Sequence, residues 1–263
     1  MICVFDCETV PDASLIRATS QFASEIRDKE LSLMAMKEQE SKTGSGFLPV
    51  PFHQVVAISA VIADDYGRFS KVSSIEGACE KEMIENFLGF IDRYNPRLVS
   101  FNGRGFDIPM LFIRALKYNL SCPAFFEQEN HSLNKTRWDN YRSRYSEQFH
   151  LDLLEVFGHY GAVRGLKLDT VCAMAGVPGK YDVSGDQVLD LYYDGELDKI
   201  KEYCESDVLN TYILFLKYEL LKGNLTIEDY REFLGLMSAK LPRNRGYYEI
   251  FSEFVEKEVN DAG

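Results

Sequence analysis

The chain has 263 residues, of which 46% are hydrophobic and 27% charged, which is ordinary for a globular protein and enough to bury the core of one large domain. Its formal net charge of −12 argues against non-specific binding of nucleic acid over a broad surface, because such binding needs many Lys and Arg contacts to phosphate. A protein that engages only a few nucleotides at one end of a strand is not excluded, because bound metal ions can supply positive charge there.

The sequence shows no signal for a membrane or for zinc. It has no run of eighteen apolar residues and no basic N-terminal stretch followed by an apolar one, so we expect neither a membrane span nor a signal peptide. Six cysteines are scattered without a Cys-x-x-Cys pair and without neighbouring histidines. This pattern argues against a zinc site and favours reduced thiols, so we expect a cytoplasmic protein.

The first seventy-five residues predict three strands and an insertion. Residues 2–6 form a short, almost wholly apolar strand. Residues 10–50 are polar and helix-prone and end in a Gly/Ser-rich stretch, which indicates a helical insertion next to that strand. Residues 54–63 and 68–75 are strand-like on either side of the turn at 64–67, which predicts an antiparallel hairpin.

The middle of the chain alternates helix and strand. Residues 80–94 have apolar positions at helical spacing and stop before Pro96. Residues 98–101 predict a further strand, which a glycine-rich turn joins to a helix over 108–118. Residues 121–148 mix charged and aromatic side chains without a clear period, so we expect an irregular segment.

The C-terminal part is predicted to be helical. The helical patterns lie at 151–160, 166–174, 197–221, 226–238 and 247–259. A turn is predicted at 176–180, and the last two helices form an extension over 223–263. Hairpin strands followed by helices and further strands indicate a mixed α/β sheet flanked by helices, in a single domain over 1–263. The pattern alone fits several α/β folds.

Asp6 and Glu8 form the first candidate motif, directly after the first apolar strand. A carboxylate at the C-terminal end of a strand projects into the crevice where open α/β sheets bind ligands. Since the two residues are two apart in extended chain, both should point to the same face. An isolated Asp-x-Glu pair is a weak signal, because roughly nine in ten such pairs are solvated surface or helix caps.

The second motif runs from Asn102 to Asp107, after the strand at 98–101. Asn102 and Gly103 predict a tight turn, and Gly105 allows the backbone to approach a ligand closely. Phe106 is placed to stack on a base, and Asp107 begins the next helix. The alternative is that Asp107 serves only as the N-cap of that helix.

Tyr203 and Asp207 make the third motif. They are four residues apart on a predicted helix, so they share a face. The carboxylate can complete a metal site while the phenol contacts an attacking water or a phosphate. The alternative is that Tyr203 is a half-buried residue in a plain hydrogen bond with Asp207.

Together these motifs place four carboxylates near one point: Asp6, Glu8, Asp107 and Asp207. Without a cation such a cluster repels itself, so the pKa of at least one member should be raised. Oxygen ligands of this kind hold divalent cations, and a pair of such ions is the machinery of phosphodiester cleavage. We therefore expect two divalent ions, Mg²⁺ or Mn²⁺, as cofactors.

The order Asp-x-Glu, Asn-x4-Asp and Tyr-x3-Asp resembles the three exonuclease motifs of the DEDD superfamily, with Tyr203 marking the tyrosine subclass. Further segments look like a family of predicted bacterial exonucleases related to the proofreading domain of family-B DNA polymerases. These segments are 166–169, 176–180, 184–188 and 202–212. The resemblance covers about residues 1–218 and is weakest over 10–50 and in the C-terminal tail.

The resemblance implies a ribonuclease-H-like fold and stepwise release of nucleoside 5′-monophosphates from the 3′ end of single-stranded nucleic acid. It implies that Asp6, Glu8 and Asp207 hold the nucleophile-side metal, and that Asp6 and Asp107 serve the leaving-group side. Tyr203 would orient the water. The substrate contacts that we expect are Thr9, Asn102, Gly103, Phe106 and Tyr203. The nuclease would stand alone or serve a polymerase or repair protein in trans.

Two further clusters are ambiguous. One interleaves basic and aromatic side chains, as a single-strand stacking groove does, but equally fits a surface loop with a partly buried Trp. Its members are Lys135, Arg137, Trp138, Tyr141, Arg142, Arg144 and Tyr145. The other is Arg243 and Arg245, which fit phosphate contacts less well than a solvated turn.

Three other functions remain open from the sequence. An enzyme that trims RNA 3′ ends would use the same residues, because recognition of the 2′-hydroxyl depends on a few contacts. An idle nucleic-acid-binding module has no need of four clustered carboxylates. A phosphatase with Asp6 as nucleophile normally wants a second Asp where this chain has Glu8. The sequence contains no residue pattern that distinguishes a DNA substrate from an RNA substrate. We expect DNA.

Overall fold

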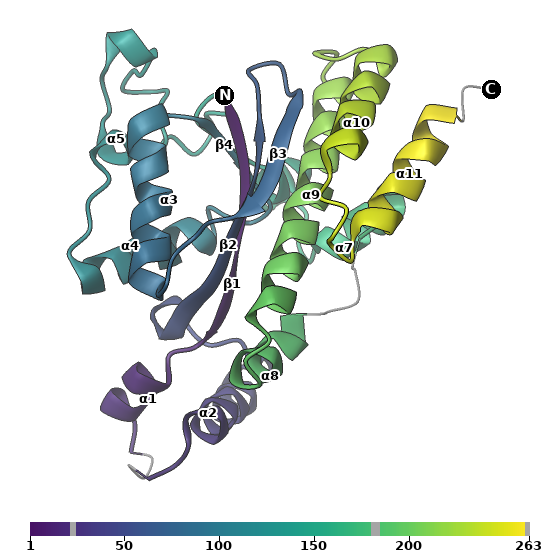
Figure 1. Cartoon of the computed structure of the whole chain (residues 1–263). Coiled ribbons are helices and arrows are strands. Elements are labelled where there is room, and N and C mark those ends of the chain that lie inside the picture. Colours follow the sequence, from purple (N-terminus) through teal and green to yellow (C-terminus); the bar gives the residue numbers. More distant parts are fainter. Residues whose placement is uncertain (22–24, 180–184, 261–263) are drawn as a thin grey trace.

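The computed structural model describes residues 1–21, 25–179 and 185–260. A five-stranded mixed sheet in the order β3-β2-β1-β4-β5 forms its centre (Figure 1). The strands are β1 (Ile2–Pro11), β2 (His53–Ala63), β3 (Phe69–Ser74), β4 (Arg97–Ser100) and β5 (His150–Asp152). Strand β1 pairs antiparallel with β2 and parallel with β4, so it occupies the middle of the sheet. The predicted mixed α/β class is confirmed.

Helices cover both faces of the sheet, and β1 alternates between them. Cys3, Phe5 and Cys7 pack in the core under the first group of helices. Ile2 and Val4 pack in the core under the second group, which includes the longest helix. Because the side-chain period of a strand is two residues, Asp6 and Glu8 lie on the same face as Val4. The alternation that builds the core therefore also aims both carboxylates at the second group of helices.

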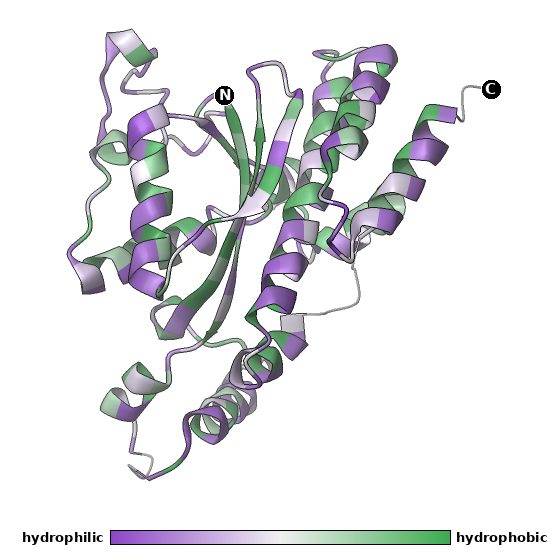
Figure 2. Ribbon diagram, viewed as in Figure 1, coloured by the Kyte–Doolittle hydropathy of each residue, from purple (hydrophilic) through white to green (hydrophobic). Residues whose placement is uncertain are grey.

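The helices over the first face are α3 (Glu80–Tyr94), α4 (Asp107–Tyr118) and α5 (Pro123–Phe126). The second face carries α7 (Leu168–Ala175), α9 (Leu197–Leu221), α10 (Ile227–Lys240) and α11 (Tyr248–Asn260). Helix α9 lies along β1 and β2, and α10 and α11 pack outside it (Figure 1). Figure 2 shows mostly hydrophobic central strands, whereas α3 and α9 mix hydrophobic and hydrophilic residues.

The predicted insertion is helical, with α1 (Ala13–Thr19), α2 (Asp28–Thr43) and a 3₁₀ turn, η1 (Val50–Phe52). A buried ion-pair network ties its start to the first face. The Arg114 guanidinium on α4 donates to Asp12 and Glu80, and all three side chains are buried. This network fixes the point where the chain leaves β1.

The structure corrects the helix that the sequence predicts over 151–160. The segment contains the end of β5, a short helix α6 (Leu153–Phe157) and a 3₁₀ turn, η3 (His159–Gly161). Asp152 ends the strand and caps α6, because its side chain accepts from the backbone N–H groups of Leu154 and Glu155. A three-residue strand is too short to show a period.

Smaller differences also occur. Strand β1 continues to Pro11, beyond the predicted end at residue 6. A short helix, α8 (Val188–Tyr193), was not predicted, and it packs on α9 and β1. The segment 121–148, expected to be irregular, contains the short helix α5 and a 3₁₀ turn, η2 (His131–Leu133), and is irregular over 134–148. Another 3₁₀ turn, η4 (Gly185–Gln187), precedes α8. The predicted turn at 176–180 begins with Gly176 at φ +69°, and its last residue lies outside the described residues. Among the described helices, none combines the length and the apolar character that crossing a membrane requires.

Candidate active site

Strand β1 delivers the first two carboxylates to the face covered by α9. The carboxylate oxygens of Asp6 and Glu8 and the sulfur of Cys204 all lie within 4.8 Å of one another. The Cys204 thiol also donates to the backbone oxygen of Asp6, with 3.4 Å between the two atoms. Helix α9 is thus docked on β1 at the residue that carries the first candidate ligand.

Asp107 comes from the other side, at the start of α4. Its side chain is only 4% exposed. Phe106 occupies the N-cap position, so the alternative in which Asp107 merely caps the helix is wrong. The backbone N–H and the thiol of Cys7, one residue after Asp6, act on the Asp107 carboxylate and partly offset the rise of its pKa that burial causes. This places the second motif against the first.

Tyr203 and Asp207 lie on the face of α9 that meets β1. Both are buried, and after burial the charge of the Asp207 carboxylate is the largest cause that raises the pKa of the Tyr203 phenol. Negative charge on Asp6 and Glu8 also acts on this phenol. Tyr203 thus faces Asp207, as the alternative interpretation has it, and it also faces the carboxylates of the first motif.

We call Asp6, Glu8, Asp107 and Asp207 the carboxylate cluster, and the other members raise the pKa values of Asp6 and Glu8, as expected. Burial raises the pKa of Asp6 well above its usual value, and Asp107, Glu8 and Asp207 raise it further. The pKa of Glu8 is also raised well above its usual value, first by burial and then by the charges of Asp207 and Asp107. Burial also raises the pKa of Asp107 to about 7. The prediction that crowding raises at least one pKa is confirmed.

Of the four carboxylates in the cluster, only those of Asp6 and Glu8 belong to the group within 4.8 Å, and their oxygen donors fit hard divalent cations. Carboxylate oxygens are the ligands that Mg²⁺ and Mn²⁺ prefer, and their mutual repulsion is relieved when a cation lies among them. The nearby sulfur adds little to this set, because burial and the charges of Asp6 and Glu8 raise the pKa of Cys204 well above its usual value. A protonated thiol is a poor metal ligand.

The turn of the second motif is held by Asp152, which sequence reasoning missed. This buried carboxylate, at the C-terminal end of β5, accepts from the backbone N–H groups of Asn102 and Arg104, both at 2.9 Å. Asn102 has the left-handed φ of +72° that the tight turn requires. Asp152 thereby sets the path of the chain from β4 to Asp107.

Both glycines of this turn are required by contacts inside it. A Cβ on Gly103 would lie 2.4 Å from Ser100 Oγ, and one on Gly105 would lie 2.5 Å from Asn102 Oδ1. The close approach predicted at Gly105 is therefore an approach to Asn102, and no ligand is needed to explain it.

An aromatic group stands beside Asp107. The rings of Phe47 and Phe106 have centroids 5.1 Å apart, and the His53 ring lies 4.6 Å from Phe47 and 5.0 Å from Phe106. Thr9 joins this group through a 2.9 Å hydrogen bond between its Oγ1 and His53 Nδ1. Phe47, at the end of the insertion, is 58% exposed. We call Phe47, His53 and Phe106 the aromatic wall.

The aromatic wall adjoins the carboxylate cluster across a cavity of about 490 Å³. This cavity is lined by Asp6, Cys7, Phe47, Leu48, Pro49, Val50, Phe101, Asn102, Gly105, Phe106 and Asp107. Sequence reasoning named Phe106 and Thr9 but missed Phe47 and His53, because a contact across the insertion leaves no local signal.

The two ambiguous clusters are resolved in part. Lys135 and Tyr141 are fully buried and cannot belong to a stacking groove. Trp138 is 80% exposed, so the alternative with a partly buried Trp is also wrong. Arg245 pairs with Glu205 of α9, which contradicts the solvated turn expected there.

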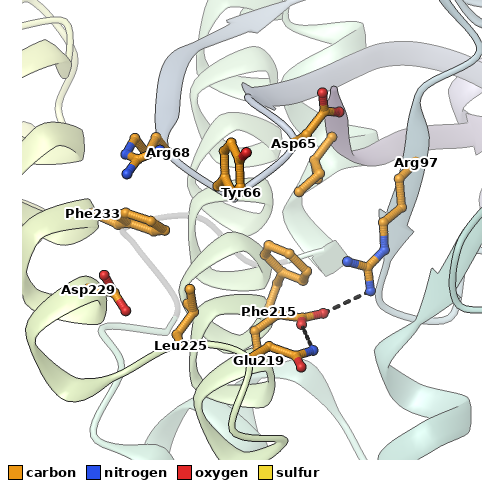
Figure 3. A pocket seen from close by; sticks show the side chains of 11 residues that line it. Asp65, Tyr66, Arg68, Arg97, Phe215, Glu219, Leu225, Asp229 and Phe233 are labelled. Atoms are coloured by element: carbon orange, nitrogen blue, oxygen red, sulfur yellow. Dashed lines mark hydrogen bonds and ion pairs between the residues drawn. The ribbon is translucent and has the colours of Figure 1, made fainter.

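A second cavity, of about 370 Å³, lies between the β2–β3 turn and the α9–α10 region (Figure 3). Arg97 Nη2 and Glu219 Oε1 are paired at 2.8 Å within it, and Glu219 also accepts from Asn224. No member of the carboxylate cluster lines this cavity, and these polar groups already satisfy one another.

Comparison with known proteins points to one family. A family model described as a predicted 3′–5′ exonuclease related to the exonuclease domain of PolB matches residues 45–258. This range contains the second and third motifs, and it begins after Asp6 and Glu8.

Two similar curated proteins are far longer than this chain. A DNA polymerase of Archaeoglobus fulgidus is 25% identical over 160 residues, which is 57% of this chain and 20% of that protein. The DNA polymerase catalytic subunit of elephantid herpesvirus 1 is 29% identical over 152 residues, which is 54% of this chain and 15% of that protein. The chain thus spans at most about a fifth of the length of these relatives.

A solved structure supports the fold. The family B DNA polymerase from the hyperthermophilic archaeon Pyrobaculum calidifontis superposes with a TM-score of 0.50 and 18% sequence identity. The match covers 90% of this chain and 29% of the polymerase chain. At this identity the likeness shows the fold alone, and it agrees with the expected ribonuclease-H-like arrangement.

Proposed function

The chain belongs to the family of predicted 3′–5′ exonucleases related to the exonuclease domain of PolB, and we propose that it hydrolyses phosphodiester bonds at the 3′ end of single-stranded nucleic acid, with release of nucleoside 5′-monophosphates. The observation that carries this proposal is the meeting of three distant segments in the carboxylate cluster, where Asp207 and Asp107 both act on the pKa of Asp6 and Glu8.

The carboxylate cluster would hold two divalent ions, Mg²⁺ or Mn²⁺. Asp6, Glu8 and Asp207 would be the ligands on the nucleophile side, and Asp6 with Asp107 would serve the leaving-group side. The chemistry supplied on binding is polarisation of the phosphodiester and activation of a water molecule. The raised pKa values of Asp6, Glu8 and Asp107 support this assignment, because the cluster favours a bound cation over four free charges.

Tyr203 would orient the attacking water, as in the tyrosine subclass of DEDD exonucleases. Burial and the Asp207 charge raise the pKa of its phenol far above the usual value, so it stays protonated at neutral pH. It would therefore act as a hydrogen-bond donor, beside Asp207, Glu8 and Asp6.

The aromatic wall would take the base of the 3′-terminal nucleotide. Stacking of a base on an aromatic ring contributes about 1–3 kcal/mol and needs no particular sequence. A paired base has its faces covered by neighbours and is not available to Phe47 or Phe106, which favours an unpaired end. Thr9, Asn102 and Gly103 would add contacts near the sugar and phosphate.

We propose that residues 1–263 act as one exonuclease domain, with the insertion at 10–50 and the extension at 223–263. DNA is favoured as the substrate because the relatives that this chain matches are DNA polymerases. A polymerase or repair protein acting in trans would supply the strand end. A cytoplasmic location is consistent with six free cysteines among the described residues.

Parallel digestion of end-labelled single-stranded DNA, single-stranded RNA and duplex DNA tests the proposal. Single-stranded DNA should be shortened in Mg²⁺ or Mn²⁺, and EDTA should stop the reaction. If RNA is shortened faster than DNA, the function of the site would be the trimming of RNA 3′ ends and not the digestion of DNA. Absence of cleavage in all three with either metal would contradict the proposal.

A further inference from the structure

Glu205 is a buried carboxylate on α9 that lies between Tyr203 and Asp207 in the sequence. Its side chain is 1% exposed, although it belongs to neither the carboxylate cluster nor the core. A helix turns about 100° per residue, so Glu205 points about 200° away from each of its two neighbours in the third motif. Glu205 therefore lies on the face of α9 opposite to the face that carries Tyr203 and Asp207.

Within the described part of the chain, the hydrogen-bond partners of Glu205 all lie outside α9. Its Oε1 accepts from Ser74 N at 3.0 Å and Ser74 Oγ at 2.9 Å, at the end of β3. Its Oε2 accepts from Tyr247 Oη at 2.9 Å and lies 3.1 Å from Arg245 Nε. Both Arg245 and Tyr247 belong to the C-terminal extension, just before α11.

The same network reaches β2, the strand that pairs with β1 at Asp6. Ser74 Oγ lies 3.0 Å from Ser59 Oγ, and Ser59 is the direct partner of Asp6 in the β1–β2 register. Ser59 is fully buried. One continuous set of polar contacts thus joins the C-terminal extension, the back of α9 and the strand opposite the first motif.

We propose that Arg245 and Tyr247 are positioning residues, which set the rotation of α9 about its axis through Glu205 and so align Tyr203 and Asp207 with Asp6 and Glu8. The inference rests on the proposed function, and it assigns a role to the C-terminal extension. Side-chain atoms of a helix lie about 5–6 Å from its axis, so a rotation of about 10° moves them by about 1 Å. A displacement of that size can cost roughly a hundredfold in rate.

The chain offers a matched control. Tyr230 is also buried in the C-terminal extension, and its phenol also donates to a carboxylate, Glu258, at 2.9 Å. Among the described residues, no hydrogen bond joins it to Glu205. Tyr230→Phe and Tyr247→Phe therefore remove the same kind of hydrogen bond, but only the second belongs to the positioning network.

The experiment measures kcat, KM, Mn²⁺ affinity and melting temperature of the full chain for both variants, with a 3′-labelled oligonucleotide as substrate. Tyr247→Phe should lower kcat about tenfold and weaken Mn²⁺ binding several-fold, with KM within about twofold of wild type. Tyr230→Phe should lose a similar amount of melting temperature but keep kcat and Mn²⁺ affinity. Arg245→Met should resemble Tyr247→Phe, and Arg245→Lys should restore part of the loss.

Equal loss of melting temperature in the two Tyr→Phe variants, with wild-type kcat and Mn²⁺ affinity in Tyr247→Phe, would overturn the inference. The two proposals can fail separately. If wild type cleaves no nucleic acid, the proposed function fails, and the Mn²⁺ affinities alone then decide whether the network positions Asp207.

Discussion

Replacement of Asp107 by Asn should stabilise the metal-free protein. The pKa of Asp107 rises from 3.8 to about 7 in the folded chain, mainly through burial. A carboxyl group whose folded pKa is raised resists ionisation, so its penalty is absent below pH 4 and grows until the pH passes the folded value. At 1.36 kcal/mol per pKa unit, the penalty reaches about 4 kcal/mol at pH 8.

Asn keeps the size of the side chain and an acceptor for the Cys7 N–H group but cannot ionise. For a chain of this length, about 1 kcal/mol corresponds to about 2 °C in melting temperature. Asp107→Asn should therefore melt several degrees above wild type in EDTA at pH 8, and by less than half that margin at pH 5.

Calcium provides the decisive comparison, because it can occupy oxygen sites without requiring turnover. At a hundred times its Kd, an ion that binds only the folded state adds about 2.7 kcal/mol. Wild type should gain most of this, and Asp107→Asn much less. If the variant melts below wild type in EDTA at pH 8 and gains as much from Ca²⁺, then Asp107 is a structural residue and the metal site is misassigned.

Three further predictions concern single residues. Tyr203→Phe should keep metal and strand binding but lose about 10²–10⁴-fold in turnover, the usual range for a group that handles or positions a proton donor; an unchanged rate would make Tyr203 purely structural. Phe47→Ala should raise KM for single-stranded DNA by about fivefold or more, as expected for loss of one stacking contact, whereas Phe126→Ala, which removes an aromatic side chain that is 52% exposed and outside the cavity, should not. Burial, and then Arg104, holds the pKa of His150 well below 6.5, so the neutral imidazole stabilises the fold fully above that pH and this stabilisation is lost as the pH falls. In urea titrations between pH 6.5 and 5, the free energy of unfolding of His150→Gln should fall less steeply than that of wild type, by up to about 1.4 kcal/mol per pH unit. Equal slopes would contradict this.

The sequence was informative where local pattern determines structure. The apolar run before Asp6 predicted a central strand, and the period of two placed Asp6 and Glu8 on one face of it. The helical spacing over 197–221 predicted α9 to the residue and therefore the shared face of Tyr203 and Asp207. The order of the motifs along the chain then indicated that β1 and α9 contribute to the same site.

What the sequence could not predict depends on contacts between distant segments. Asp152 lies in a three-residue strand, and its role depends on backbone groups fifty residues earlier. Phe47 reaches Phe106 only because the end of the insertion packs beside the start of α4. Glu205 looked like an ordinary helix residue, and only its partners at residues 74, 245 and 247 mark it as buried and bonded. None of these contacts has a period or a motif that would predict it.

The polarity of digestion tests the central claim most directly. A single-stranded DNA oligonucleotide with a free 3′-hydroxyl would be labelled at one end or the other and incubated with the protein and Mg²⁺. A 5′ label should give a ladder of shortening products, and a 3′ label should leave as mononucleotide from the first time point. Asp6→Asn should abolish both patterns. Cleavage of a circular single strand, which has no 3′ end, would contradict a 3′–5′ exonuclease.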